Sequence, residues 1–379
     1  MLEFLFWFFI FLILYCYVGY PLILFILGFF FGKKVEKREF FPSVSLLIPV
    51  YNEEKIIRQK IENSLALDYP KEKLEIIVAS ESNDKTNEIV KEYEQKGVKL
   101  FAFPERKGKQ HTIYRTLSKC KGEIIVLTDA NAMFKKEALK KLVRNFADKR
   151  IGCVSGQLKY INLSKGSVGE IEGVYWNYEK LIKKLESKFF SLLGANGSIY
   201  AIKKELYKPI SPFRGDDFDL PIQVILQGYG VILEPEAISE EEVYRQALSN
   251  FKRKVVFVGW HFKGALILLK EAFKKFKFFL IFQLISHKIL RWVVGFFLIF
   301  IFLINIFLIK THFFYLILFL SQILFYVLAI IGWLIERKGR KLNLLLNLIY
   351  YFCLVNLASL LGIIKSLLGK QKPVWEKVR

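Results

Sequence analysis

The stretch VSLLIPVYNEE (residues 44–54) decides the fold of this chain. Its first seven residues are mostly Val, Leu and Ile, and the polar residues Tyr51, Asn52 and Glu53 follow at once. A strand that is buried on both faces of a parallel sheet has such a continuous apolar sequence. We therefore predict a central strand over residues 44–50 with polar groups at its carboxyl end.

Similar runs recur along the next hundred residues, with helical patterns between them. Further strands are predicted over residues 74–80, 98–103, 123–129 and 151–156. Helices are predicted over residues 53–65, 85–95, 109–119 and 135–146. Strands that alternate with helices favour a parallel α/β sheet, in which ligands bind at the carboxyl ends of the strands.

The rest of the chain is strongly apolar. Of the 379 residues of the whole chain, 53% are apolar and 24% are charged, which excludes a wholly disordered chain. The 37 Phe residues and a mean hydropathy of +0.31 indicate that part of the chain lies in lipid. Four runs without a charged residue are candidates to cross the hydrocarbon layer: residues 4–32, 293–309, 311–335 and 342–364.

The formal net charge of +22 is unevenly distributed. The basic cluster at residues 33–38 follows the first apolar run, so the positive-inside rule predicts an outside N-terminus and a cytoplasmic domain after it. Residues 245–288 carry ten Lys and Arg against one Glu, interleaved with aromatic residues. This pattern favours amphipathic helices on an anionic membrane surface over nucleic-acid binding. The last apolar run has basic residues on both sides; we expect it to cross the membrane, with a re-entrant path as the alternative.

Several common types of site are absent from the sequence. The four cysteines form no CxxC pair, which excludes a zinc ribbon. No GxxxxGK[ST] occurs, and the G-x-G at residues 228–230 leads into a predicted strand, so P-loop and dinucleotide sites are excluded as well. Polar residues nevertheless follow four of the predicted strands. Four such turns at one edge of a sheet indicate a binding site there.

Taken in order, these turns resemble the motifs of membrane glycosyltransferases of family 2. The motifs are IPVYNEE (48–54), the acidic turn at Glu81, GK (108–109), TDAN (128–131), GANGSIYAI (194–202) and DDFDL (216–220). This family includes cellulose, hyaluronan and poly-N-acetylglucosamine synthases and many lipid-linked sugar transferases. The resemblance covers the whole chain and implies a GT-A fold, a Rossmann-like α/β domain, embedded in an α-helical membrane protein.

With the apolar runs and the charge pattern, the resemblance divides the chain into four parts. Residues 1–32 would form an N-terminal transmembrane helix and residues 41–244 a cytoplasmic GT-A catalytic domain. Residues 245–288 would form basic amphipathic helices at the interface, and residues 289–368 a membrane block of about three helices.

The resemblance implies a donor side of the site. The residues that would bind the nucleotide sugar are Pro49, Tyr51, Glu53, Glu81, Lys109 and Asp129. Asp129 and Asn131 occupy the DxD positions of the family and would hold Mg²⁺ or Mn²⁺, ions that prefer oxygen ligands. Asn131 offers a neutral oxygen in place of a carboxylate, and Glu81 replaces the usual Asp. Without the resemblance, Asp129 is interpreted as a turn cap and Lys109 as a solvated charge.

The resemblance also implies an acceptor side. Asp217 aligns with the catalytic base of the family, which takes the proton of the acceptor hydroxyl. Asp216 replaces the usual Glu beside it, and we expect Asp216, if buried, to raise the proton affinity of the pair. Gly194, Asn196 and Gly197 would form the acceptor-side loop. The alternative is that the acidic residues only start a helix, where they interact favourably with its dipole.

One motif of the processive polymer synthases, QxxRW, is missing after Asp217, because residues 246–250 read QALSN. An Arg-Trp pair occurs later, at residues 291–292, and His287 before it is expected to be an interfacial anchor rather than a catalyst.

We therefore expect an inverting glycosyltransferase that moves a sugar from a UDP-sugar to a lipid-linked or surface-glycan acceptor. We expect it to work at the cytoplasmic face of the cell membrane with a divalent metal ion and without nucleic acid. One alternative is a processive polysaccharide synthase. Another is a transporter or structural membrane protein with a non-catalytic α/β domain.

Overall fold

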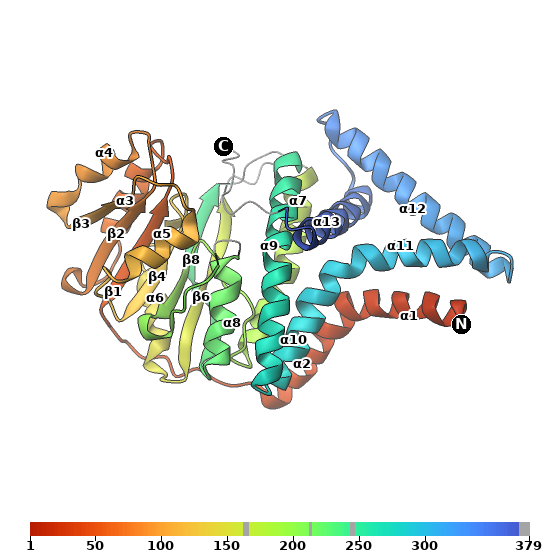
Figure 1. The fold of residues 1–379 in the computed structure, drawn as a ribbon, viewed down its shortest axis with the longest axis horizontal. Helices are drawn as coiled ribbons and strands as arrows, with labels where there is room; N and C mark the ends of the chain where they lie inside the picture. Colours follow the sequence, from red (N-terminus) through yellow and green to blue (C-terminus); the bar gives the residue numbers. More distant parts are fainter. Residues whose placement is uncertain (162–166, 212–213, 243–246, 371–379) are drawn as a thin grey trace.

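The computed structural model describes residues 1–161, 167–211, 214–242 and 247–370, and an α/β domain lies beside a group of long apolar helices (Figure 1). The domain is built on an eight-stranded sheet with the strand order β3-β2-β1-β4-β7-β6-β8-β5. The strands are β1 (Val44–Val50), β2 (Leu74–Ser80), β3 (Val98–Ala102), β4 (Ile124–Leu127), β5 (Met133–Phe134), β6 (Ile151–Ile161), β7 (Tyr200–Lys203) and β8 (Gly230–Glu242).

The sheet is parallel in one half and mixed in the other. β1 pairs in parallel with β2 and β4, and β2 pairs in parallel with β3. β7 is antiparallel to both of its neighbours, β4 and β6, and β5 is antiparallel to β8. The β6–β8 pair is parallel. The predicted parallel sheet is therefore confirmed from β3 to β4 and is wrong beyond β4, where the short antiparallel strand β7 is inserted.

The predicted strands 44–50 and 74–80 are confirmed as β1 and β2 with the same bounds. The other three predicted strands are confirmed with shifted ends, and the fifth extends to Ile161. The helices of the domain are α3 (Ile57–Leu65), α4 (Thr86–Lys91), α5 (Lys109–Leu117), α6 (Ala138–Val143), α7 (Ser167–Ser187) and α8 (Asp216–Leu226). Short 3-10 turns complete it: η2 (Lys71–Lys73), η3 (Glu94–Lys96), η4 (Arg144–Ala147) and η5 (Lys204–Leu206).

Two apolar layers cover the two faces of the sheet. Successive residues of a strand point to opposite faces, and β1 shows this alternation. Leu46 and Ile48 pack in the layer under α3 and α6, whereas Leu47 packs with Ile77 in the layer under α5 and α8. Because the helices cover the faces, the polar turns after the strands are left at the open edge of the sheet.

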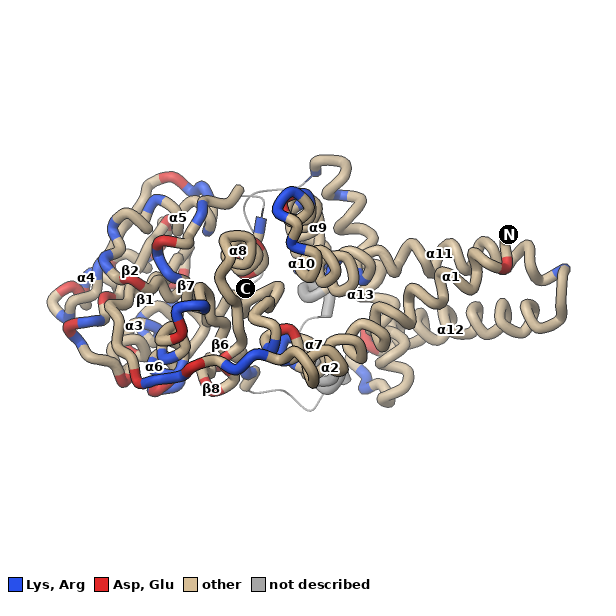
Figure 2. Tube along the Cα trace, turned by 90° about the horizontal axis from the view of Figure 1, so that it is seen from below, with Lys and Arg blue, Asp and Glu red and all other residues tan. Residues whose placement is uncertain are grey.

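Four helical segments among the described residues are long and apolar enough to cross a membrane: Leu2–Phe31, Phe278–Leu308, Phe313–Arg337 and Leu344–Leu367. They comprise α1 (Leu2–Leu14), the π-helical turn η1 (Tyr15–Gly19), α2 (Tyr20–Phe31), α10 (Phe278–Gln283), the π-helical turn η6 (Leu284–Ile289), α11 (Leu290–Leu308), α12 (Phe313–Arg337) and α13 (Leu344–Leu367). Figure 2 shows that charged residues crowd the α/β domain and are sparse along these helices.

The second apolar segment starts well before the run predicted at residue 293. Arg291, one of the charges that limited the predicted run, is largely buried within the segment, where its Nη1 lies 2.5 Å from Glu179 Oε1 of α7. A charge that is paired inside the protein does not interrupt an apolar helix, so α10, η6 and α11 continue through it.

The interpretation of His287 as an interfacial anchor is wrong, because its side chain is buried. Its Nδ1 lies 2.6 Å from Glu186 Oε1, and the Tyr20 hydroxyl donates to the same oxygen at 2.7 Å. The Tyr15 hydroxyl lies 2.7 Å from Ser286 Oγ, so the turns η1 and η6 also meet there. The carboxylate of Glu186, on α7, provides the polar partner inside the protein that the sequence pattern did not reveal.

The helix α9 (Ala247–Lys274) stands between the α/β domain and the apolar helices (Figure 1). Its residues Val258 and Phe262 lie in one buried cluster with Phe218 of α8 and Ile363 of α13. The approach of α13 is close, since a Cβ on Gly362 would lie 2.7 Å from the carbonyl oxygen of Val255. Through these contacts α9 connects α8 to α13, the last of the apolar helices. The expected position of this basic region on a membrane surface remains a prediction.

Candidate active site

The turns that follow β1 and β2 are hydrogen bonded to each other. The backbone N–H of Asn52 donates to Ser82 Oγ at 2.8 Å, and Asn52 Oδ1 accepts from the N–H of Asn83 at 2.9 Å. The N–H of Glu53 donates to Thr86 Oγ1 at 2.8 Å. Asn52 has a φ of +54°, in the left-handed region that Asn tolerates better than most residues. These contacts fix the turn and delay the start of α3 to Ile57, four residues after the predicted start.

Two more predicted donor-side residues lie at the end of β1: Pro49 within the strand and Tyr51 directly after it. The guanidinium of Arg106 stacks on the Tyr51 ring at 3.7 Å from the ring centroid, which orients the phenol at the sheet edge. Pro49 pairs in register with Ala79 of β2, and it is part of the strand rather than of the turn.

The Glu81 carboxylate holds the loop before α5. One of its oxygens accepts from the N–H groups of Lys107 and Gly108, at 3.0 and 2.9 Å, and the other lies 2.6 Å from Arg115 Nη2. Gly108 has a φ of +94°, which a residue with a side chain rarely adopts. Glu81 therefore fixes the backbone that starts α5 and, with it, the position of Lys109.

The Lys109 ammonium connects two carboxylates from different parts of the chain. Its Nζ lies 2.9 Å from Asp129 Oδ1 and 3.7 Å from Asp216 Oδ1. Burial alone would lower the pKa of Lys109, but the carboxylates of Asp129 and Asp216 outweigh it and raise that pKa well above its ordinary value. Lys109 is thus a fixed cation at the centre of the site.

A second lysine supports the turn that carries Asp129. The buried Lys60 Nζ donates to Thr128 Oγ1 at 2.9 Å and to the carbonyl oxygen of Ala132, on either side of this turn. It also lies 4.4 Å from the centroid of the Phe134 ring. Burial, opposed by the Asp129 carboxylate, lowers the pKa of Lys60 to about 7.

The Asp129 turn has the chemistry of a weak divalent metal site. Asp129 is 40% exposed and contributes a carboxylate, and Asn131, two residues on, contributes a neutral amide oxygen. Both are hard oxygen donors that suit Mg²⁺ or Mn²⁺. Among the described residues no group of three His, Cys, Asp or Glu side chains gathers in a way that could hold a metal ion. The residues present therefore fit a metal whose remaining ligands come from a bound phosphate or from water.

Asp216 is buried, and its carboxylate is engaged by neighbouring side chains. Its Oδ1 accepts from Gln110 Nε2 and its Oδ2 accepts from the Tyr200 hydroxyl, each at 2.7 Å. These bonds join the start of α8 to α5 and β7. Asp216 thus has the geometry of a residue that positions the start of α8.

Asp217 is in contrast partly exposed, at 28%, and lies over the acceptor-side loop. Burial would raise its pKa, but His261, followed by the Lys109 and Lys183 ammonium groups, holds the pKa of Asp217 below its ordinary value. The expectation of a raised proton affinity is therefore wrong for Asp217, because these three groups together outweigh its burial. Asp217 is ionised at neutral pH, as a general base requires.

The loop of residues 194–197 lies directly against Asp217. The N–H of Ala195 donates to the backbone oxygen of Asp217 at 2.7 Å. A Cβ on Gly197 would lie 3.5 Å from Asp217 Oδ2, and one on Gly194 would lie 3.7 Å from the Asp217 backbone oxygen. The small residues of this loop let it approach the Asp217 carboxylate.

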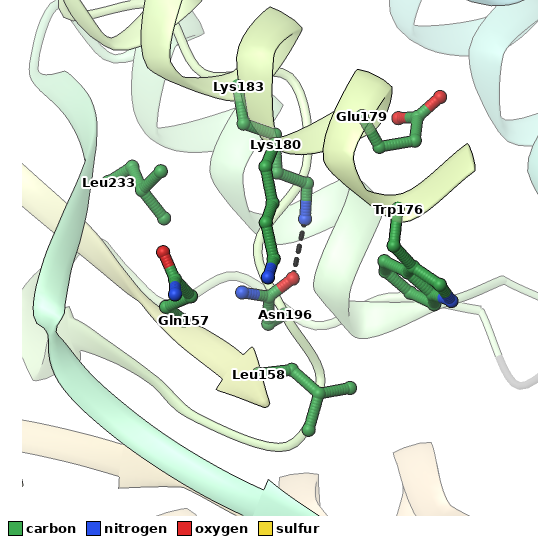
Figure 3. A pocket seen from close by; sticks show the side chains of 8 residues that line it. All are labelled: Gln157, Leu158, Trp176, Glu179, Lys180, Lys183, Asn196 and Leu233. Carbon is green, nitrogen blue, oxygen red and sulfur yellow. Dashed lines mark hydrogen bonds between the residues drawn. The ribbon is translucent and has the colours of Figure 1, made fainter. Parts of the chain in front are cut away.

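Asn196 of this loop lines a pocket between β6 and α7 (Figure 3). Its Oδ1 accepts from Lys183 Nζ at 2.6 Å, and its N–H donates to Ser155 Oγ at 2.9 Å. Burial and the nearby Lys288 ammonium lower the pKa of Lys183 to about 8. The pocket is lined by Gln157, Leu158, Trp176, Glu179, Lys180, Lys183, Asn196 and Leu233. Two lysines and one carboxylate thus line it beside aromatic and aliphatic side chains.

The structure thus brings most of the predicted site residues to one edge of the sheet, and it adds four that were not predicted: Lys60, Arg115, Lys183 and His261. Lys60 left a signal in the sequence, because it falls on the same helical face as the apolar residues Ile57 and Ile61. A cation on a buried face needs polar partners, and Thr128 and Ala132 provide them. The other three have no comparable signal, since their partners are distant in the sequence.

Comparison with known proteins gives a match to the α/β domain. Residues 45–210 match the model of the family described as Glycosyl transferase family 2. The match spans most of the α/β domain, which is therefore similar to the glycosyltransferases of that family.

Curated relatives agree with this assignment. The chain is 30% identical over 215 residues to the probable glycosyltransferase YdaM of Bacillus subtilis, which covers 53% of this chain and 51% of the relative. It is 25% identical to a dolichyl N-acetyl-alpha-D-glucosaminyl phosphate 3-beta-D-2,3-diacetamido-2,3-dideoxy-beta-D-glucuronosyltransferase of Methanococcus voltae, over 57% of this chain and 71% of the relative. It is 24% identical to the poly-beta-1,6-N-acetyl-D-glucosamine synthase of Staphylococcus aureus, over 62% of this chain and 58% of the relative. The chain thus spans between about half and seven-tenths of the length of these relatives.

One solved structure is similar over nearly the whole chain. It is the mannosyltransferase PcManGT of Pyrobaculum calidifontis in complex with GDP-Man and Mn²⁺, with a TM-score of 0.71 at 21% identity. The match covers 98% of this chain and 100% of that one. At this identity the likeness concerns the fold, and it confirms a GT-A-type α/β domain joined to long apolar helices.

The role of Glu81 can be tested by the substitution Glu81→Gln. An amide at this position turns a donor toward Arg115 or toward the Lys107–Gly108 backbone, so the loop and Lys109 shift. Loss of one charge-assisted hydrogen bond, about 1.5–3 kcal/mol, corresponds to a roughly tenfold or greater weakening of nucleotide binding. Calorimetric titration of the purified protein with UDP and with GDP measures the effect. Glu92→Gln, which breaks an exposed pair with Arg58, is the control, and equal affinities in both variants would show that Glu81 has no such role.

Proposed function

We propose that the chain is an inverting glycosyltransferase that moves a sugar from a UDP-sugar to a lipid-linked or surface-glycan acceptor at the cytoplasmic face of a membrane. The observation that carries the proposal is the position of Asp217. Its carboxylate lies against the loop at Gly197, and the positive charge of Lys109 helps to hold its pKa below the ordinary value. That is the arrangement needed to deprotonate a hydroxyl next to a diphosphate leaving group.

The reaction follows as a single displacement. The acceptor O–H bond breaks and its proton passes to Asp217 while the acceptor oxygen bonds to C1 of the donor sugar. The bond between C1 and the diphosphate oxygen breaks at the same time, and the nucleoside diphosphate leaves with the electron pair. One displacement from the face opposite the leaving group inverts the configuration at C1.

The donor side would neutralise the leaving diphosphate. Lys109, 2.9 Å from Asp129, is placed to contact a phosphate oxygen, and the turn after β1 with Tyr51 and Glu53 would contact the nucleoside. Asp129 and Asn131 would hold Mg²⁺ or Mn²⁺, which when bound supplies positive charge to the phosphate oxygens. The similar mannosyltransferase structure is named as a complex with Mn²⁺, which supports the use of a divalent ion.

Three observations support an acceptor that carries a phosphate and a lipid. Lys180 and Lys183 line the pocket beside Asn196 together with Glu179, whose carboxylate is paired with Arg291, and an anionic group would complement the two lysines (Figure 3). The pocket-bearing helix α7 packs on α2, one of the apolar helices, through a buried cluster that includes Tyr20 and Ile182. The Methanococcus relative is named for a dolichyl phosphate-linked sugar acceptor. We therefore place the acceptor phosphate near Lys183 and its chain among the apolar helices.

A processive polysaccharide synthase is the second candidate, and the named function of the Staphylococcus relative favours it. Such an enzyme has to hold a growing hydrated chain and conduct it across the bilayer. The QxxRW platform is missing from this chain, and the three apolar segments after the domain carry few polar side chains. Sugar hydroxyls without partners in hydrocarbon cost several kcal/mol each, so we propose a product of one or a few sugars.

The metal site is tested by Asp129→Ala. Removal of this carboxylate should lower transfer at least 100-fold, because it removes both the proposed metal ligand and the partner of Lys109. The variant should keep the melting temperature of the wild type, since Asp129 is partly exposed. Asp68→Ala removes a half-exposed carboxylate that also pairs with a lysine, Lys140, and should leave transfer unchanged. Full activity of Asp129→Ala, or wild-type turnover with excess chelator, would overturn the assignment.

Product length separates the two candidate functions. Vesicles that contain this protein as the added enzyme are incubated with a panel of radiolabelled UDP-sugars, with GDP-mannose included, and with lipid extract as acceptor. We expect label from a UDP-sugar in the solvent-extractable fraction at low mass, and none with Asp129→Ala. Label in high-mass polymer would favour the synthase, and label from GDP-mannose alone would reject the UDP-sugar donor.

A further inference from the structure

A buried imidazole lies behind the proposed catalytic base. His261 belongs to α9, outside the sheet, and its side chain is 3% exposed. Its Nδ1 lies 2.6 Å from the backbone oxygen of Phe257, one helical turn earlier. A carbonyl oxygen only accepts hydrogen bonds, so Nδ1 carries a proton and donates it to Phe257. This contact fixes the protonation of one ring nitrogen.

The other ring nitrogen, Nε2, faces Asp217. It lies 3.5 Å from Asp217 Oδ1 and makes no hydrogen bond with any other described group. With Nδ1 already protonated, a neutral ring would turn the lone pair of Nε2 toward an ionised carboxylate oxygen, which is repulsive. The doubly protonated ring can instead donate to Asp217 from Nε2. The arrangement therefore suits an imidazolium paired with an aspartate.

The surroundings are shaped to hold this pair. A Cβ on Gly215 would lie 2.5 Å from His261 Nε2 and 3.0 Å from Asp217 Oδ1, so a glycine is needed for the ring to reach the carboxylate. The imidazole is packed between aromatic rings: the centroid of the Phe257 ring lies 3.8 Å away, and the Phe218 ring meets it edge to face at 5.1 Å. The imidazole thus has little freedom to turn away from Asp217.

The two oxygens of Asp217 consequently have different surroundings. Oδ1 lies 3.5 Å from His261 Nε2, whereas Oδ2 lies 3.5 Å from the place that a Cβ on Gly197 of the acceptor-side loop would take. A contact that holds Oδ1 also decides which oxygen is presented to an acceptor hydroxyl. Because His261 lies on α9, the orientation of the base depends on a helix that also packs against α13.

We propose that His261 is a positioning residue, which as an imidazolium holds Oδ1 of Asp217 so that Oδ2 takes the proton of the acceptor hydroxyl. The proposal rests on the proposed function of Asp217 as the base. His261 keeps its own proton throughout: the acceptor proton goes to Oδ2, the acceptor oxygen bonds to C1, and the diphosphate leaves with the C1–O electron pair.

Other charged groups near the pair are accounted for. Lys109 of α5 and Lys183 of α7 act on Asp217 in the same direction as His261, and with it they outweigh the effect of burial on the Asp217 pKa. Asp219, one turn into α8, is paired with Arg214 and is itself close to His261. Asp216 is bound by Gln110 and Tyr200. Loss of the imidazolium charge leaves the charges of the two lysines in place. We therefore expect the pKa of Asp217 to shift, while its carboxylate still ionises.

The test compares His261→Gln and His261→Leu with Phe262→Leu. Phe262 is a neighbouring buried residue of α9 in the apolar cluster, so its variant reports general damage to the helix. Asp217 acts when ionised, so activity falls as the pH drops through its pKa. Removal of a neighbouring positive charge raises that pKa. The acid limb of the kcat/KM profile should therefore move to higher pH, by roughly one pH unit, in both His261 variants. It should stay in place in Phe262→Leu.

The rates should separate charge from position. We expect kcat to fall roughly 10- to 100-fold in His261→Leu, within the range attributed to general base catalysis, and less in His261→Gln, whose amide can still donate to Oδ1. Nucleotide binding should stay within about twofold of the wild type, because the donor side is untouched. Gly215→Ala keeps the histidine but displaces its ring from Asp217. It replaces His261→Leu as the test if the His261→Leu protein does not fold, and we expect the same fall in kcat.

Two results would overturn the proposal. One is an acid limb that stays at the wild-type pH in both His261 variants. The other is a loss of kcat in His261→Leu no greater than in Phe262→Leu. A wild-type protein that transfers no sugar from any donor would instead reject the proposed function, and the two failures are therefore distinguishable.

Discussion

The site depends on the contact of the Lys109 ammonium with two carboxylates that the fold brings to one edge of the sheet. Asp129 follows β4 and Asp216 starts α8, and without a cation between them they would repel each other. Lys109 lies 2.9 Å from the first and 3.7 Å from the second, so it joins the donor side to the acceptor side. Its own position depends on Glu81, which holds the backbone at Gly108 through two N–H bonds.

The same balance of charge extends from the sheet to the apolar helices. Asp217 faces His261 of α9 and Lys183 of α7, and α9 packs on α13 while α7 packs on α2. The acceptor side of the site is thus built by helices that contact the apolar segments, whereas the donor side is built by the sheet. This division suits a soluble donor that enters from the sheet edge and an acceptor that remains associated with lipid.

Much of the sheet and of the site could be predicted because the signals were local. The strands β1 and β2 are continuous apolar runs, and the polar turns that follow them converge because parallel strands share an edge. β7 was missed since its four residues are too few to show a period. His287 was interpreted wrongly and His261 was not predicted at all, because their polar partners, Glu186 and Asp217, are distant in the sequence. Their roles depend on how α7 and α9 pack, which local pattern does not encode.

The central claim is that Asp217 accepts the proton of the acceptor while Lys109 and the Asp129 turn hold the donor. Asp217→Asn tests it most directly, because the amide keeps the size and polarity of the side chain but cannot take up the proton. Nucleotide affinity and transfer are measured on the same purified protein in vesicles with a lipid-linked acceptor. We expect UDP affinity within about twofold of the wild type and a loss of transfer of 100-fold or more, at the upper end of the range for a positioned base. Loss of UDP binding with normal transfer per bound donor would contradict the claim.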